Sequence, residues 1–213
     1  IDRAGIVGND GETHQGLFDV AMLSSVPGIT VYSPATYEEL RKTLYESIYH
    51  QTGVCCVRYP RGGEGKLPAG FAPDEAWSVR SISPKSPRKK LGLVTYGKET
   101  VQVCKAAEQL KEQGIAVSVL KLLRLLPFPE DSLRPLMGCD AILFVEEGIQ
   151  SGGIGQMFGE KLLERQYRGE YRILAVDNRF VEQASTDRAL ALTGLDAAGI
   201  VRTCQTWLGI AAD

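Results

Sequence analysis

The chain has 213 residues, of which 44% are hydrophobic and 23% are charged, and its formal net charge is -2. This composition is typical of a globular protein, and the length suffices for one domain or two small ones. The small negative charge argues against nucleic-acid binding as the main activity. No apolar run approaches the roughly 18 residues that indicate a membrane span, and no signal-peptide pattern is present. We therefore expect neither nucleic acid nor a membrane as a partner.

The five cysteines are odd in number, and their spacing fits neither a zinc site nor a disulfide framework. Cys55 and Cys56 stand side by side in an apolar, strand-like run, which predicts that both are buried by packing. This use of cysteine is typical of a reducing compartment and predicts a cytoplasmic protein.

The first 60 residues predict two helices, each followed by a strand. Residues 16–25 predict a short helix, and residues 29–32 predict a β-branched strand. A longer helix follows the Ser-Pro-Ala-Thr start signal and extends to about residue 50, and residues 54–59 predict a buried strand. The longer helix has one apolar face with spacings of three and four: Tyr37, Leu40, Leu44 and Ile48.

Residues 61–90 differ in composition, because glycine, proline and charge dominate and only residues 77–82 have strand-like content. We interpret them as a linker. The predicted division is therefore a first unit at residues 1–60, a linker at 61–90 and a second unit at 91–213.

The second unit alternates strands with helices. Strands are predicted at residues 91–96, 115–120, 141–145 and 171–176. Helices are predicted at residues 100–113, 131–137, 155–166, 186–193 and 197–211. Strands separated by helices predict an α/β fold with a parallel, doubly wound sheet.

The strongest candidate site lies in residues 2–16, where glycines at 5, 8, 11 and 16 accompany Arg3, Asp10 and His14. Glycines permit tight turns and close approach to a ligand. An imidazole titrates near neutral pH, and an arginine holds a phosphate or carboxylate with a planar fork of donors. The alternative interpretation is a surface loop in which Asp10 forms a turn and His14 caps the next helix.

Arg58 and Arg61 are further candidates for anion binding. Residues three apart on a strand point to opposite faces, so at most one of the two faces a shared site. For either arginine the alternative is a surface salt bridge.

Two features near residue 150 are weaker candidates. Residues 151–155 are glycine-rich and precede a helix, but they complete neither a dinucleotide-binding nor a P-loop motif. Glu146 and Glu147 are adjacent on a strand and therefore diverge. We expect a helix cap or an interface contact from them rather than a catalytic carboxylate pair.

Four motifs together resemble the 1-deoxy-D-xylulose-5-phosphate synthases, thiamine-diphosphate enzymes of the transketolase group. They are DRAGIVGNDGETHQG at residues 2–16, RYPRG at 58–62, VEEG with GGIG at 145–155, and GLDAAGI at 194–200. Their order and spread imply the C-terminal part of such an enzyme: part of a pyrimidine-type domain followed by a transketolase C-terminal-type domain. Residues 121–128 depart from the family pattern, since Leu123 and Leu126 stand where the family has arginine and lysine.

The resemblance also implies roles for the candidate residues. His14 corresponds to the family's active-site histidine, which helps to move protons, and Asp10 to a residue that contacts a hydroxyl of the acceptor. Arg3 and Arg61 correspond to residues that hold the phosphate of glyceraldehyde 3-phosphate. The implied reaction joins a two-carbon unit from pyruvate to that acceptor in a homodimer, and the product feeds isoprenoid, thiamine and pyridoxal synthesis.

The resemblance implies thiamine diphosphate and Mg²⁺ as cofactors. The family ligands of the diphosphate and the metal do not appear in this sequence, and the sequence identifies no other cofactor-binding residue. The family holds the diphosphate and metal with a Gly-Asp-Gly motif in an N-terminal domain, and its activating glutamate precedes the first motif. Because the chain begins in mid-motif, we expect a fragment that is inactive without the missing N-terminal part. We also expect residues 1–16 to be loosely held.

Alternatives remain within and outside this group. Another transketolase-group enzyme is possible, either a transketolase or the β-subunit of a 2-oxo acid dehydrogenase, whose lipoyl acceptor would need no arginine pair. The chain could also be a non-catalytic module for dimerisation or regulation.

Overall fold

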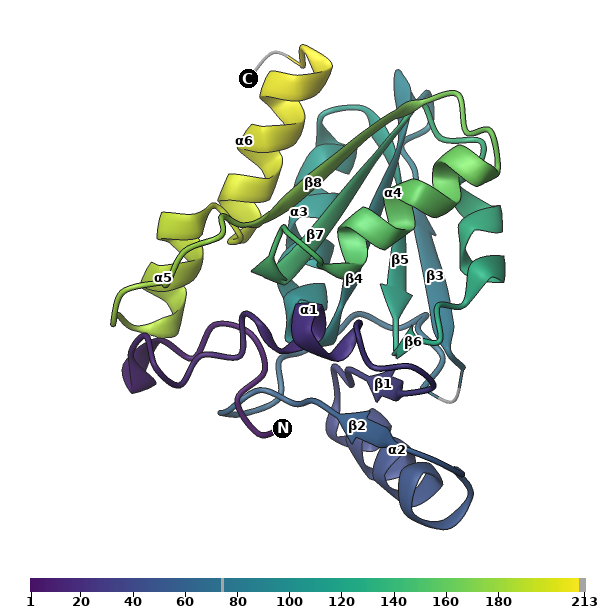
Figure 1. Ribbon diagram of the computed structural model, residues 1–213. Helices are drawn as coiled ribbons and strands as arrows, with labels where there is room; N and C mark the ends of the chain where they lie inside the picture. Colours follow the sequence, from purple (N-terminus) through teal and green to yellow (C-terminus); the bar gives the residue numbers. More distant parts are fainter. Residues whose placement is uncertain (74, 211–213) are drawn as a thin grey trace.

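The structure is a computed structural model that describes residues 1–73 and 75–210. Its main body is a five-stranded sheet in the order β3-β5-β4-β7-β8 (Figure 1). The strands are β3 (Trp77–Ile82), β4 (Lys89–Tyr96), β5 (Ile115–Leu122), β7 (Ala141–Ile149) and β8 (Glu170–Val176). The last four are mutually parallel, whereas β3 pairs antiparallel with β5 at one edge. The strand-like residues 77–82 of the predicted linker therefore belong to this sheet.

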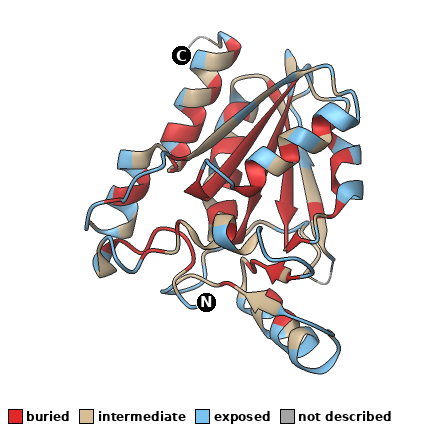
Figure 2. Cartoon of the chain, viewed as in Figure 1, coloured by how far each residue is buried: buried red, intermediate tan, exposed pale blue. Residues whose placement is uncertain are grey.

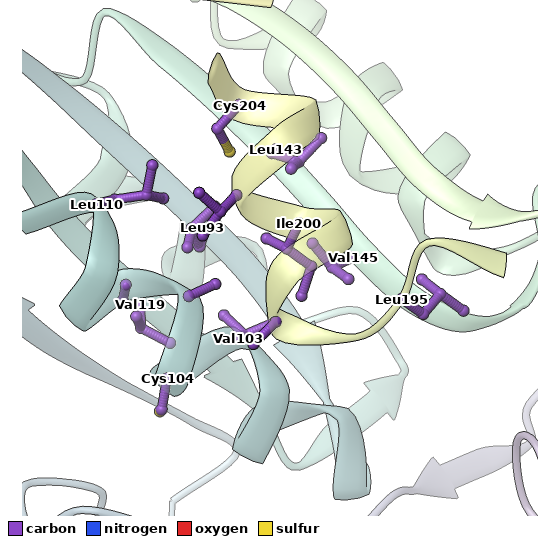
Figure 3. Close-up of a cluster of buried hydrophobic side chains, with 14 of the residues drawn as sticks. Leu93, Val103, Cys104, Leu110, Val119, Leu143, Val145, Leu195, Ile200 and Cys204 are labelled. Carbon is purple, nitrogen blue, oxygen red and sulfur yellow. The ribbon is translucent and has the colours of Figure 1, made fainter. Parts of the chain in front are cut away.

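Helices cover both faces of the large sheet, as strands buried on both sides require. On one face α3 (Thr100–Glu112) and α6 (Ala197–Leu208) pack on side chains such as Leu93 and Leu143 (Figure 3). On the other face α4 (Ile154–Glu164) packs on a second cluster that contains Phe144 and Phe158. The doubly wound α/β fold predicted from the sequence is confirmed.

Two elements of the second unit differ in detail from the prediction. Residues 130–136 form the 3-10 helix η3 (Glu130–Leu136) rather than an α-helix, and Pro135 inside it cannot donate the backbone hydrogen bond that an α-helix needs. Strand β7 continues through Glu146 and Glu147 to Ile149 instead of ending at residue 145. Helix α5 (Thr186–Thr193) has the predicted bounds and ends at Gly194, whose φ of 73° is in the left-handed region. The predicted end of the last helix, at residue 211, lies outside the described residues.

The first unit is small and projects from the main body (Figure 1). It contains α1 (Asp19–Leu23), β1 (Thr30–Tyr32), α2 (Tyr37–Tyr49) and β2 (Cys55–Val57), with β1 and β2 parallel. The prediction of a buried strand at residues 54–59 was wrong, because β2 lies at the open edge of its sheet and is only half-buried. Cys55 and Cys56 are half-buried for the same reason.

Helix α2 exposes most of its apolar side. Figure 2 shows this helix largely in the colours of exposed and intermediate residues. Tyr37 and Ile48 are 59% and 67% exposed, whereas the buried side chains of the helix are Glu39 and Thr43. The periodicity of the sequence therefore marked a face that no described part of the chain covers.

The two units interlock through a strand that the sequence analysis did not predict. Strand β6 (Arg124–Leu126) leaves the second unit and pairs antiparallel with β1, which completes the three-stranded sheet β2-β1-β6. Beside this contact, the carboxylate of Glu39 on α2 forms an ion pair with Lys121 on β5, and both side chains are at most 2% exposed.

Residues 1–16 pack against the edge of the large sheet, contrary to the expectation of a loosely held segment. Ala4, Ile6 and Val7 are buried, and the Ile149 amide donates to the Leu17 carbonyl at 3.0 Å. Figure 1 shows this purple segment near the end of β7. The segment that carries Arg3, Asp10 and His14 is therefore placed at the carboxyl edge of the parallel strands, where open α/β sheets bind ligands.

Within the described residues, no helix is both long and apolar enough to cross a membrane.

Candidate functional site

Asp10 stands at the centre of the candidate site. It closes the short 3-10 helix η1 (Gly8–Asp10), and its side chain is 11% exposed. The Arg3 guanidinium donates to one carboxylate oxygen at 2.6 Å, and Arg61 forms an ion pair with the other. Two arginines from distant parts of the sequence therefore converge on one carboxylate.

The two arginines remain open to solvent. The Arg3 side chain is 39% exposed and that of Arg61 is 58% exposed. An arginine side chain has five N–H donors. In the recorded hydrogen bonds, Arg3 and Arg61 each donate only one of them to Asp10. The group carries a net charge of +1 and keeps free donors, which suits an anionic ligand.

Arg58 has a different environment from Arg61. Its side chain is 3% exposed and donates to both carboxylate oxygens of Asp19, at 3.0 and 3.1 Å. Its guanidinium also donates to Ser33 and the Gly16 carbonyl, both at 3.2 Å. Arg58 is thus engaged inside the fold, and of the two arginines only Arg61 reaches the Asp10 group. The sequence analysis did not identify Asp19 as its partner, and no local pattern indicates this contact across 39 residues.

His14 lies on the exposed side of the same segment. Its Nδ1 lies 2.8 Å from the Thr13 hydroxyl, and this is the hydrogen bond that the structure records for its side chain. No hydrogen bond to the other ring nitrogen, Nε2, is recorded among the described residues. The structure records no contact between His14 and Arg3, Asp10 or Arg61. It brings the last three together and leaves His14 four residues further along the same segment.

A cavity of about 390 Å³ adjoins Arg61. Its wall combines apolar side chains such as Tyr37, Leu40 and Tyr59 with the cationic Arg61 and Lys98. Lys98 was not found from the sequence, where it stands alone after Gly97 without any motif. A mainly apolar hollow with a few charged groups is the usual form of a small-molecule site.

Glu146 explains the glycine-rich segment at residues 151–155. The buried Glu146 carboxylate accepts hydrogen bonds from the Ile154 and Gly155 amides at the start of α4, at 3.2 and 3.0 Å, and from the Tyr96 hydroxyl at 2.8 Å. A Cβ on Gly153 would lie 2.5 Å from the same carboxylate. The expected helix cap is confirmed, and the positive end of α4 is already neutralised by the protein.

The pKa of Glu146 is raised to about 6, because burial penalises its charged form more than the hydrogen bonds from Tyr96, Gly155 and Ile154 favour it. Glu147 points to the opposite side of the strand, where its carboxylate accepts from the Ile6 amide at 2.8 Å. The alternation of side chains along a strand could have suggested that one glutamate faces residues 2–16.

No group of three or more His, Cys, Asp or Glu side chains among the described residues is arranged to hold a metal ion. The described residues therefore do not fit the role of holding a metal ion.

Family models match most of the chain. Residues 1–64 match the transketolase pyrimidine binding domain, and residues 82–200 match the transketolase C-terminal domain. The chain belongs to the transketolase family. This family depends on thiamine diphosphate, which the resemblance in the sequence had implied.

Two relatives share the name that the motifs suggested. The chain is 33% identical over 204 residues to 1-deoxy-D-xylulose-5-phosphate synthase of Synechococcus sp. (strain JA-3-3Ab), a match of 94% of this chain and 31% of the relative. It is 32% identical over 209 residues to the synthase of Enterobacter sp. (strain 638), a match of 98% and 33%. The chain therefore spans about a third of the length of these relatives.

A solved structure has the same fold. A protein described as a split gene transketolase, inactive beta4 tetramer, superposes with a TM-score of 0.81 at 25% sequence identity. The match covers 99% of this chain and 66% of that one.

Proposed function

We propose that this chain is the acceptor-binding part of a 1-deoxy-D-xylulose-5-phosphate synthase, a transferase of the transketolase type. The complete enzyme would condense pyruvate, with loss of CO₂, with glyceraldehyde 3-phosphate, and its product would feed isoprenoid, thiamine and pyridoxal synthesis. The observation that carries the proposal is the convergence of Arg3 and Arg61 on Asp10. The relatives in Synechococcus and Enterobacter support it through their shared name.

Each residue has a defined task in this proposal. Arg3 and Arg61 hold the acceptor phosphate with their free donors, because planar guanidinium groups bind phosphate oxygens in pairs. Asp10 fixes both arginines and accepts a hydrogen bond from an acceptor hydroxyl. His14 exchanges a proton with the reacting oxygen through Nε2, as an imidazole placed beside the acceptor can.

The proposal assigns the cofactors to another part of the enzyme. Thiamine diphosphate and Mg²⁺ belong to the complete synthase. We assign the ligands of the diphosphate and the metal to the missing part, since the described residues contain no suitable metal-binding group. Alone, the 213-residue chain is therefore expected to be inactive. The division into residues 1–60, a linker at 61–90 and residues 91–213 is part of the same proposal, with β3 as a linker strand added to the large sheet.

The surface of the first unit supports a partner that completes it. Strand β2 has a free edge, and the adjacent α2 exposes Tyr37, Tyr45, Ile48 and Tyr49, each by more than half of its surface. Exposed apolar groups of this kind mark interaction sites. We assign this surface to the remaining part of the pyrimidine-binding unit, since the family relatives are about three times as long.

The proposed enzyme is a cytoplasmic homodimer. All five cysteines are free thiols, which suits a reducing compartment. The solved neighbour is described as a tetramer.

The test is reconstitution of activity. The chain is mixed with a polypeptide that supplies the missing N-terminal part, thiamine diphosphate and Mg²⁺, and formation of 1-deoxyxylulose 5-phosphate is followed. Activity is expected in the mixture and not with either part alone. His14→Ala should abolish it, and Arg61→Ala should raise the KM for glyceraldehyde 3-phosphate.

Arg168→Ala is the matched control for Arg61→Ala, because Arg168 is exposed and far along the chain from the site. It should leave the KM unchanged. Parts that fold and associate but form no product from pyruvate would overturn the proposed reaction.

The structural neighbour favours one second candidate, a transketolase. The donor distinguishes the two reactions. Product from a ketose phosphate donor, with none from pyruvate, would establish the second candidate.

A further inference from the structure

Two buried glutamates meet beneath the candidate site. Glu99 follows the carboxyl end of β4 and is 1% exposed, and Glu147 lies near the carboxyl end of the adjacent strand β7 and is 7% exposed. Both carboxylate oxygens of Glu99 are buried and take no part in the recorded hydrogen bonds, and Glu147 is the side chain that interacts with Glu99 most strongly. A hydrogen bond between two carboxyl groups requires a proton on one of them, since two carboxylates offer only acceptors.

Glu147 is also the direct support of residues 2–16. Its Oε2 accepts from the Ile6 amide at 2.8 Å, across 141 residues of sequence. The contact is close, because a Cβ built on Gly5 would lie only 2.5 Å from Oε2. Gly5 has a φ of 74°, so the backbone turns there and passes over the carboxylate. Asp10 and His14 follow in the same segment.

From this geometry we propose that Glu99 and Glu147 share a single proton and act as positioning residues that clamp residues 2–16 onto the large sheet. Protonated Glu99 donates to the Glu147 carboxylate, and that carboxylate accepts from Ile6. Loss of the proton would place two negative charges side by side in a buried space and release the segment. The inference deepens the proposed function and rests on it only where activity is concerned.

The charges around the pair favour this distribution of the proton. Burial raises the pKa of Glu99 well above its ordinary value, and the negative charges of Glu147 and Asp196 raise it further. Burial also raises the pKa of Glu147, whereas the Ile6 amide, Glu99, Lys98 and Arg58 lower it. Glu99 is therefore the protonated partner and Glu147 the carboxylate. Lys98 is partly exposed, and Arg58 is already paired with Asp19.

The direction of the pH effect follows from the raised pKa of Glu99. The stabilisation of the clamped state is complete below the ordinary pKa of a glutamate and is lost as pH rises toward the raised pKa. Opening releases one proton over this range, so the equilibrium shifts toward the open segment by about tenfold per pH unit.

The test is amide hydrogen exchange of the full chain between pH 5 and 8, with each rate corrected for intrinsic chemical exchange. Protection of the Ile6 amide should fall by up to about tenfold per pH unit, whereas the Phe144 amide within β7 should keep its protection. Glu99→Gln should abolish the slope, because its amide group donates to Glu147 at every pH. Glu112→Gln, a change of an exposed glutamate at the end of α3, should retain it.

Glu147→Leu provides a second variant, and it should remove the protection of Ile6 at all pH values because the acceptor is lost. A pH-independent protection of Ile6 in the unmodified chain would overturn the proposal, and so would a slope that survives Glu99→Gln. The unmodified chain alone therefore gives a decisive result even if a variant fails to fold.

The reconstituted enzyme supplies the functional readout. Glu99→Gln should extend the pH profile of kcat/KM to higher pH, whereas a merely structural role would lower activity by one factor at every pH. The expected exchange behaviour in mixtures that show no synthase activity would reject the proposed function and support the clamp. Active mixtures in which the exchange test fails would support the proposed function and reject the clamp.

Discussion

Arg58 and Arg61 are three residues apart, and their surroundings decide what each can do. Arg58 is enclosed by Asp19, Ser33 and the Gly16 carbonyl, whereas Arg61 is open to solvent beside Asp10. Strand alternation predicted from sequence that at most one arginine would face the site, but the structure separates them without a strand, since β2 ends at Val57. The sequence did not show what encloses Arg58, because Asp19 lies 39 residues away and its approach depends on the tertiary fold.

The two arginines should therefore differ in their effect on stability. Arg58→Met leaves the Asp19 carboxylate without its partner and should lower the free energy of unfolding by about 3–5 kcal/mol. Arg61→Ala removes an exposed side chain and should change it by less than about 0.5 kcal/mol. Urea denaturation of both variants measures the difference, and equal losses would contradict the assignment of Arg58 to the interior.

Glu146 should make stability depend on pH. Its folded pKa of about 6 exceeds the ordinary 4.5, so its contribution to stability is complete below about pH 4.5 and is lost as pH rises through about 6. The loss at neutral pH is about 2 kcal/mol. Comparison of urea unfolding at pH 4.5 and 7.5 should show a smaller decrease for Glu146→Gln than for the unmodified chain.

Glu160→Gln is the control for this measurement, since Glu160 is an exposed glutamate of the same helix α4. It should keep the full pH dependence. A Glu146→Gln variant with that same dependence would show that the buried carboxyl is not its source.

At the scale of elements, the long periodic segments were the ones that sequence predicted well. The helices α2, α3, α5 and α6 begin within a few residues of their expected starts. Strand β6 was missed because three residues of Arg-Leu-Leu contain no alternation to detect, and its pairing with β1 is set by distant parts of the chain. The apolar face of α2 was detected from the sequence. The sequence could not reveal that the buried contact of this helix is instead the Glu39–Lys121 ion pair.

The Glu39–Lys121 pair links α2 to β5. Glu39 also accepts from the Ala35 amide at 2.7 Å, while the Thr36 hydroxyl accepts from the Glu39 amide at 3.2 Å, so the same residue completes the N-terminal cap of the helix. Lys121 therefore supplies the cation that the capping carboxylate of Glu39 faces inside the fold.

Substitutions in this pair should distinguish the electrostatic contribution of Glu39 from its role in the N-terminal cap of α2. Lys121→Met leaves a buried carboxylate unpaired and should cost about 3–5 kcal/mol in unfolding free energy. Adding Glu39→Gln removes the buried charge but keeps a side-chain acceptor for Ala35, and should recover much of the loss. Urea denaturation of the two single variants and the double variant gives the coupling, and strictly additive losses would argue against a direct interaction.

For the whole molecule, a substitution on the exposed face of α2 should affect assembly but not stability. Ile48→Glu places a charge on this face and should block reconstitution with the missing part. Because Ile48 is 67% exposed, the substitution should change the free energy of unfolding of the chain alone by less than about 0.5 kcal/mol. Leu192→Glu on α5, at 62% exposure, is the control and should leave reconstitution intact.

The contribution of β6 to the small sheet limits how this chain can be recombined with its relatives. A chimaera joined at residues 61–90 would take β1 and Glu39 from one parent and β6 and Lys121 from the other. The junction would lie in the linker, yet it would mismatch both the β1–β6 strand pair and the Glu39–Lys121 ion pair. A chimaera should therefore fold when residues 121–126 come from the same parent as the first unit. The segments that must be exchanged together are thus discontinuous in sequence.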